Sequence, residues 1–112
     1  ILAAADLFCG KSGANMTAEP CFFGVPQIIT KYATTIERYN GKYYVEVVGS
    51  ALKIFKPKKV VEKIEDFLAH PEKLEPLKKA ACAQRSNYGA EKCANVIFEL
   101  LCSKFPHLKE DN

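Results

Sequence analysis

The chain has 112 residues, of which 48% are hydrophobic and 26% are charged, and its formal net charge is +3. These values are typical of one folded domain over residues 1–112 and exclude a wholly disordered chain. The charge is too small for a typical nucleic-acid-binding protein, and no run of 18 apolar residues occurs. The composition therefore predicts no nucleic-acid partner and no membrane span.

The first forty residues are expected to form two helices joined by a loop. Apolar spacing predicts a short helix over residues 1–8, and the glycine-containing stretch 10–20 is typical of a loop. Pro26 suits the first turn of a helix, where its missing N–H has no partner to lose, and Asn40-Gly41 suits the end of that helix. The apolar opening "ILAAADLF" is typical of a mature chain whose signal peptide has been removed.

Four more helices complete the expected fold. Residues 42–56 alternate like a strand in their first half and follow helical spacing in their second half, and a helix is expected because no hairpin partner lies nearby. Helical spacing is clearer over residues 57–69, 72–84 and 90–105. The last segment is apolar around most of its circumference, which predicts burial between other helices. The expected fold class is all-α, a single disulfide-stapled bundle of five to six helices with a buried C-terminal helix.

Cysteine content and one glycosylation sequon favour secretion to the extracellular space. Asn15 begins an Asn-Met-Thr sequon in the expected loop, so it is a candidate for N-glycosylation. The cysteines lack the spacing of a zinc or thioredoxin-like site, and structural disulfide bonds are expected instead, with no metal site. An odd count leaves one thiol unpaired or shared between two chains. The five candidates are Cys9, Cys21, Cys82, Cys93 and Cys102.

The spacing Cys82-x10-Cys93-x8-Cys102 is similar to the last three cysteines of insect odorant-binding proteins, which are small secreted helical carriers. The segments "AHPEKLEPLKKAACAQ" and "GAEKCANVIFELLC" also resemble that family, so the similarity covers about residues 70–102. The resemblance implies a bridge between Cys82 and Cys102 and a helical cage for small apolar ligands. The central C-x3-C pair of the family has no counterpart in this chain.

In size, cysteine content and basic balance the chain also resembles small helical salivary proteins of blood-feeding insects, in particular the anopheline family that includes anophensin and albicin. This resemblance implies a binding protein that inhibits a host protease cascade, such as complement or contact activation. The expected partner would then be a host plasma protein or protein complex.

Two exposed surfaces are candidates for partner binding. Five lysines occur within eleven residues, and they form either a solvated helix junction or a site for an acidic protein or a sulfated polysaccharide. Tyr39 and Tyr43 are either interface anchors or residues at the rim of the core. The lysines are Lys53, Lys56, Lys58, Lys59 and Lys63.

No arrangement of residues typical of an enzyme is evident. The two histidines, His70 and His107, stand beside prolines, and no thiol or serine has a neighbouring base in the sequence. We therefore expect a non-enzymatic protein without a cofactor. The leading hypothesis is a secreted inhibitor that binds through Tyr39, Tyr43 and the lysines 53–59. The alternatives are a carrier of small hydrophobic ligands and, third, a polyanion-binding protein.

Overall fold

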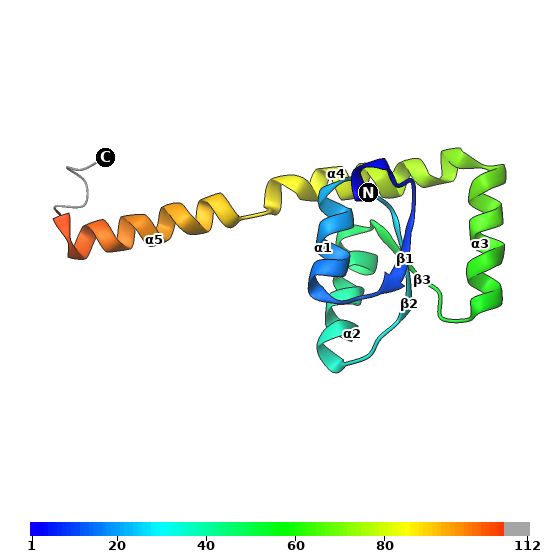
Figure 1. The fold of residues 1–112 in the computed structure, drawn as a ribbon. Coiled ribbons are helices and arrows are strands. Elements are labelled where there is room, and N and C mark those ends of the chain that lie inside the picture. The colour runs from blue at the N-terminus through cyan, green and yellow to red at the C-terminus, as the bar shows by residue number, and fades with distance from the viewer. Residues whose placement is uncertain (107–112) are drawn as a thin grey trace.

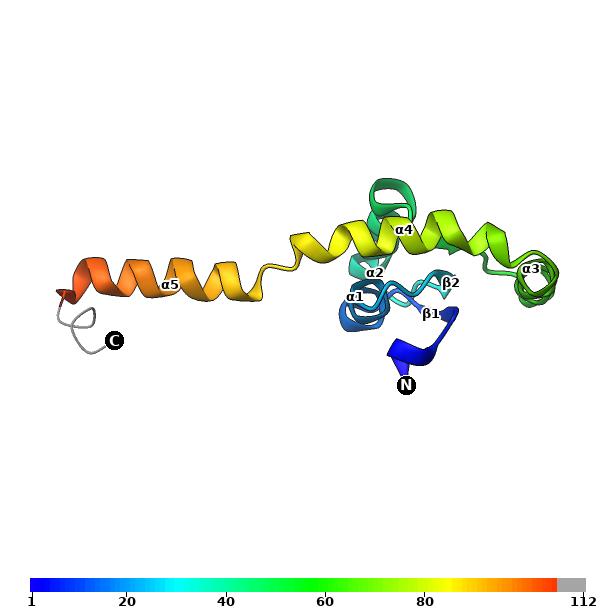
Figure 2. The ribbon, with the colours of Figure 1, turned by 90° about the horizontal axis from the view of Figure 1, so that it is seen from above.

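The computed structural model describes residues 1–106, which form a three-layer α/β domain and one projecting helix (Figures 1 and 2). Its sheet has three parallel strands in the order β1-β2-β3. The strands are β1 (Phe8–Lys11), β2 (Gln27–Lys31) and β3 (Ala51–Lys53), and the α-helices are α1 (Ala14–Phe22), α2 (Thr35–Lys42), α3 (Pro57–Ala69), α4 (Glu75–Gln84) and α5 (Ala90–Lys104). A π-helical segment covers Tyr43–Val48, and short 3-10 turns cover Leu2–Ala4, Pro71–Leu74 and Arg85–Asn87.

The core lies on both faces of the central strand β2. Successive side chains of a strand point to opposite faces, and Ile28 and Ile29 are 0% and 1% exposed. Ile29 packs in a cluster with buried residues of α1, the π-helical segment, β3 and α4. Ile28 packs in a second cluster with Phe67 of α3 and Leu74. Burial on both faces is the usual state of a strand in a parallel sheet, because helices from the crossover connections cover it on each side.

Helix α5 projects away from the domain, as both views show (Figures 1 and 2). The described structure is accordingly elongated, with principal extents of 61 × 30 × 24 Å. The large apolar side chains of α5 stay exposed to solvent, including Leu100 at 64% and Ile97 at 55%, whereas Cys102 is buried. None of the helices within residues 1–106 combines the length and the apolar character needed to cross a membrane.

The expected all-α fold is therefore wrong. The segment expected as a helix from Pro26 instead gives strand β2 followed by helix α2. Pro26 is buried just before β2, and its carbonyl accepts the N–H of Phe8 at 2.9 Å. The expected loop 10–20 holds the end of β1 and most of α1. The expected helix 42–56 divides into the last residue of α2, the π-helical segment and β3. The helix over 57–69 is confirmed with the same bounds.

The expected disulfide staples and the buried C-terminal helix are also wrong. All five cysteines are free thiols, so Cys82 and Cys102 form no bridge. The physical reason is the direction of the chain after α4, because α5 leads away from the domain instead of returning between other helices. His107, the second histidine of the sequence, lies outside the described residues.

Candidate functional site

The loops that follow the three strands gather at one edge of the sheet. Because the strands are parallel, their carboxyl ends meet at the same edge, which is where ligands bind in open α/β sheets. Helices α1, α2 and α3 each begin directly after a strand at this edge. We name the segments 11–16, 31–38 and 53–59 the carboxyl edge.

The first loop of the carboxyl edge is fastened to α2 by hydrogen bonds of buried side chains. The Ser12 hydroxyl donates to the carbonyl of Glu37 at 2.7 Å, and the Asn40 amide donates to the Ser12 carbonyl at 2.8 Å. The same amide donates to Oγ1 of Thr17 at 2.6 Å. Ser12 and Thr17 are fully buried. Paired polar groups in a buried network restrict motion, so the loop is held in one position before any ligand arrives.

The N-terminus of α1 is open to solvent and carries no side-chain cap. Gly13 is the N-cap and has no side chain to accept the free N–H groups of the first turn. The three residues of that turn, Ala14, Asn15 and Met16, are exposed. The side chain of Lys11 passes beside Gly13, because its Cε lies 3.8 Å from the place where a glycine Cβ would stand. Free N–H groups, the positive end of a helix and an ammonium group together favour an anion at this point.

Glu37 is a buried ionisable group of the carboxyl edge, and its carboxylate is held by two hydrogen bonds. Its carboxylate accepts a hydrogen bond from Nζ of Lys11 at 2.7 Å and one from the backbone N–H of Ala33 at 2.7 Å. Its backbone N–H donates to Oγ1 of the N-cap Thr34 at 3.2 Å. The hydrogen bond from Lys11, helped by that from Ala33, lowers the pKa of Glu37 below its usual range. Glu37 is therefore ionised at neutral pH, and it orients Lys11 and the second loop.

The pH dependence of stability is expected to report this interaction. A carboxyl group whose pKa is lower in the folded state contributes stability above its unfolded pKa, near 4.3, and loses it as the pH falls through the folded pKa. We expect stability to fall below about pH 5, and less steeply in Glu37→Gln. The pKa of Asp66 is also lowered, by hydrogen bonds from Lys73 and Lys63, so Asp66→Asn is the matched comparison. Urea denaturation of the parent protein and of both variants at several pH values measures these changes in stability. If the stability of Glu37→Gln falls as steeply with decreasing pH as that of the parent protein, the contribution assigned to Glu37 is wrong.

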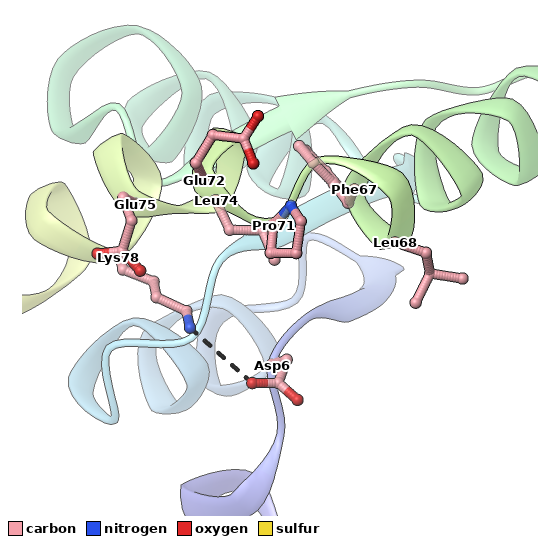
Figure 3. Close-up of a pocket in the computed structure, with 8 residues that line it drawn as sticks. All are labelled: Asp6, Phe67, Leu68, Pro71, Glu72, Leu74, Glu75 and Lys78. Carbon is pink, nitrogen blue, oxygen red and sulfur yellow. Dashed lines mark ion pairs between the residues drawn. The ribbon is translucent and has the colours of Figure 1, made fainter.

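A hollow of about 390 Å³ lies at the edge of the domain opposite to the carboxyl edge, and Figure 3 shows the residues that line it. Asp6 precedes β1, and the remaining lining residues belong to the end of α3, the 3-10 turn Pro71–Leu74 and the start of α4, so the hollow is away from the carboxyl edge. Its floor is apolar, while Asp6, Glu72 and Glu75 stand at its margin with one cation, Lys78, 3.9 Å from Asp6. These carboxylates disfavour an anionic ligand. No metal-binding group of histidine, cysteine or carboxylate residues occurs in the described part of the chain.

The residues predicted as partner-binding are exposed but do not form one site. Tyr39 is 70% exposed on α2, and the hydroxyl of Tyr43 accepts a hydrogen bond from Gln84 at 2.9 Å. Within residues 1–106, no hydrogen bond or ring contact joins either tyrosine to a lysine. The lysines 53–59 do lie on the carboxyl edge, where Lys59 pairs with Glu62 at 3.3 Å. Asn15 is exposed in the first turn of α1, and its glycosylation stays a prediction.

Lys11, Ser12, Glu37 and Asn40 did not emerge from the sequence as functional residues. The available signal was the stretch "GKSGAN", in which glycines flank a lysine and a serine directly after an apolar run. Had that apolar run been taken for a strand, the stretch would have marked a strand-to-helix loop of the kind that binds phosphate groups.

Comparison with known proteins gives one match. The family model described as glycosyltransferase family 28 C-terminal domain matches residues 1–93. No curated protein and no solved structure matches the chain.

The match contradicts both expected resemblances, to insect odorant-binding proteins and to the anophensin and albicin family. It contradicts the secreted cascade inhibitor and the carrier of hydrophobic ligands, and it points to an enzyme where none was expected. The cysteine spacing that suggested the odorant-binding family involves free thiols and therefore carries no structural meaning here. The match covers the whole sheet, the three segments of the carboxyl edge and helices α1 to α4. The chain belongs to the glycosyltransferase family 28 C-terminal domain family.

Proposed function

We propose that this domain binds the diphosphate of a nucleotide-sugar donor at the carboxyl edge and acts as the donor-binding part of a glycosyltransferase. The observation that carries the proposal is the uncapped N-terminus of α1, beside which the side chain of Lys11 passes with its ammonium group held by Glu37. Family membership supports it, because glycosyl transfer commonly uses a sugar activated by a nucleotide diphosphate.

The chemistry of such a transfer suits this arrangement. The bond between the sugar C1 and the phosphate oxygen breaks, the acceptor oxygen bonds to C1 and loses its proton, and the diphosphate leaves with an added negative charge. Fixed N–H groups and an ammonium ion stabilise charge that develops on a leaving group, because they need no reorganisation during the reaction. The network of Ser12, Asn40 and Thr17 supplies that fixed geometry.

Glu37 is poorly suited to remove the proton of the acceptor. A general base works best with a pKa near the working pH, whereas the hydrogen bond from Lys11 lowers that of Glu37. The role of Glu37 in this proposal is to position Lys11. The one histidine within residues 1–106, His70, follows α3 at its far end and is away from the carboxyl edge. The residues of this edge therefore support donor binding and leaving-group stabilisation.

Isothermal titration calorimetry of the protein with UDP and with GDP tests the proposal. We expect one of them to bind, and Lys11→Ala to weaken binding by about tenfold or more, because hydrogen bonds to charged groups are the stronger ones. Gly13→Ala is expected to weaken binding as well, since its methyl group stands where the anion approaches. In the free protein this methyl group would meet no atom closer than 3.7 Å.

Lys79→Ala is the matched control, because Lys79 is an exposed lysine of α4 away from the carboxyl edge. Its affinity for either nucleotide is expected to equal that of the parent protein. Absence of binding by both nucleotides, or an equal loss in Lys11→Ala and Lys79→Ala, would overturn the proposal.

A further inference from the structure

Helix α5 exposes a broad apolar face to solvent. Five large apolar side chains of this helix are each at least 44% exposed: Val96, Ile97, Phe98, Leu100 and Leu101. Soluble monomers rarely expose a large contiguous apolar patch unless that patch binds something. A single helix of 15 residues is also only marginally stable in water, and α5 has no side-chain cap at its start. The apolar face and the stability of the helix therefore both favour a partner.

The start of α5 is fastened to the end of α1. Nε of Arg85 donates to the carbonyl of Phe22 at 2.8 Å, and the Arg85 guanidinium lies 5.5 Å from the centre of the Phe22 ring. The Tyr88 ring meets the same ring edge to face, with 5.2 Å between the ring centres. The Tyr88 hydroxyl donates to the carbonyl of Ala18. The helix is therefore presented to a partner from a fixed base (Figures 1 and 2).

The apolar face of α5 holds a hollow of about 350 Å³, and the described residues that line it all belong to α5. Four of them are spaced at i, i+3, i+4 and i+7, namely Ile97, Leu100, Leu101 and Lys104. This is the spacing of four residues that receive one side chain of a facing helix in knobs-into-holes packing. The occupant that fits this hollow is an apolar side chain of another helix.

A second copy of α5 fits as that helix. In an antiparallel pair, a two-fold axis sets Ile97 of one copy beside Leu101 of its partner and places each hollow against an apolar side chain of the other copy. The charges of α5 also permit self-association, because two acidic residues, Glu91 and Glu99, balance two basic residues, Lys92 and Lys104. Two copies of the helix therefore do not repel each other, although the whole chain carries a net charge of +3.

The exposed area is sufficient for a weak dimer. Five large side chains that are about half exposed offer roughly 500 Å² per copy, so a pair buries on the order of 1,000 Å², near the lower limit of specific interfaces. For an interface of this size we expect a dissociation constant of about 10–100 µM. At about 1 µM, where unfolding is measured, the chain is then a monomer.

We propose that two copies of this chain associate through α5, as an antiparallel helix pair with Ile97 of one copy beside Leu101 of its partner. Because α5 leads away from the domain, this arrangement keeps the two domains at opposite ends of the pair, where they do not collide (Figures 1 and 2). No residue of the carboxyl edge belongs to α5, so both donor sites stay open. The dimer proposal does not rest on the glycosyltransferase proposal.

Sedimentation equilibrium of the full chain from about 1 to 300 µM tests the pairing. We expect the mass to rise from that of a monomer to that of a dimer, and the helix content measured by circular dichroism to rise with it. Ile97→Asp is expected to weaken association by more than about a hundredfold, because the two-fold axis brings the substitution into the interface twice.

Asn95→Asp is the matched control. It changes the charge of α5 by the same amount two residues away, about 200° around the helix and therefore on its polar side. Its affinity for a second copy is expected to equal that of the parent protein. Ile97 is 55% exposed, so Ile97→Asp is expected to keep the melting temperature of the monomer at low concentration and its binding of UDP or GDP.

Small-angle X-ray scattering tests the orientation of the two copies. An antiparallel dimer is expected to be clearly longer than the 61 Å that the described chain spans, whereas parallel helices would give a dimer about as long as one copy. A dimer of that shorter length would overturn the proposal. A chain that stays monomeric over the whole concentration range, or an equal loss of association in Ile97→Asp and Asn95→Asp, would overturn it as well.

Discussion

Replacing Ile28 by alanine is expected to lower the free energy of unfolding by about 2–5 kcal/mol. Ile28 is 0% exposed, and it joins β2 to Phe67 of α3 and Leu74 in one of the two core clusters. Removing three carbon atoms there loses the free energy gained when they leave water. It also leaves a cavity that the closely packed neighbouring side chains fill only in part. Urea denaturation followed by circular dichroism measures the loss.

Leu101→Ala is the matched comparison, because it truncates a similar side chain on α5. Leu101 is 45% exposed, so its truncation is expected to change the free energy of unfolding by less than about 0.5 kcal/mol. Comparable losses in the two variants would show that α5 packs against the domain, contrary to the structure.

Gly41→Val is expected to destabilise the fold by about 3 kcal/mol and to weaken nucleotide binding. A Cβ on Gly41 would stand 2.5 Å from Cε1 of Tyr32 and 3.1 Å from Cβ and Oγ of Ser12. Tyr32 has little room to move, because its ring also contacts Phe55. Helix α2 would have to shift away from the first loop, and the hydrogen bonds of Ser12 to α2 would lengthen.

Gly41→Ala and Gly13→Ala complete the series. Alanine at position 41 makes the same first contact but gains about 1 kcal/mol of helix propensity, so an intermediate loss is expected. Gly13→Ala meets only ordinary contacts and is expected to cost less than about 1 kcal/mol, while still weakening nucleotide binding. Thermal melts and nucleotide titrations of all three variants separate the two effects. A Gly41→Val protein as stable as the parent would show that α2 and the loop are not in close contact.

Local signals in the sequence identified some elements well. Pro57 at the first turn and His70-Pro71 at the end bound a helix in any fold, and α3 has these limits. The spacing of apolar residues also located α5 correctly as a helix. The basic segment 53–59 was recognisable from composition, and the structure places it on the exposed carboxyl edge.

The strands were missed because a buried parallel strand has no distinctive local pattern. In "QIITK" the apolar residues are adjacent, which fits one turn of a buried helix equally well. The strands that pair with β2 end sixteen residues before it and begin twenty residues after it, so no short hairpin turn marks the sheet. The candidate site was missed for the same reason, since the loop at Ser12 gains significance only once it is known to follow a strand.

Local patterns were enough to show that the chain is helix-rich and mildly basic, that α3 and α5 are helices, and that five cysteines are present. The folded chain was needed to show that β1, β2 and β3 pair, that the cysteines stay unpaired and that α5 lies exposed. The physical reason is the range of the interactions concerned. Helix limits depend on neighbouring residues, whereas strand pairing, thiol proximity and burial depend on which distant segments the whole chain brings together.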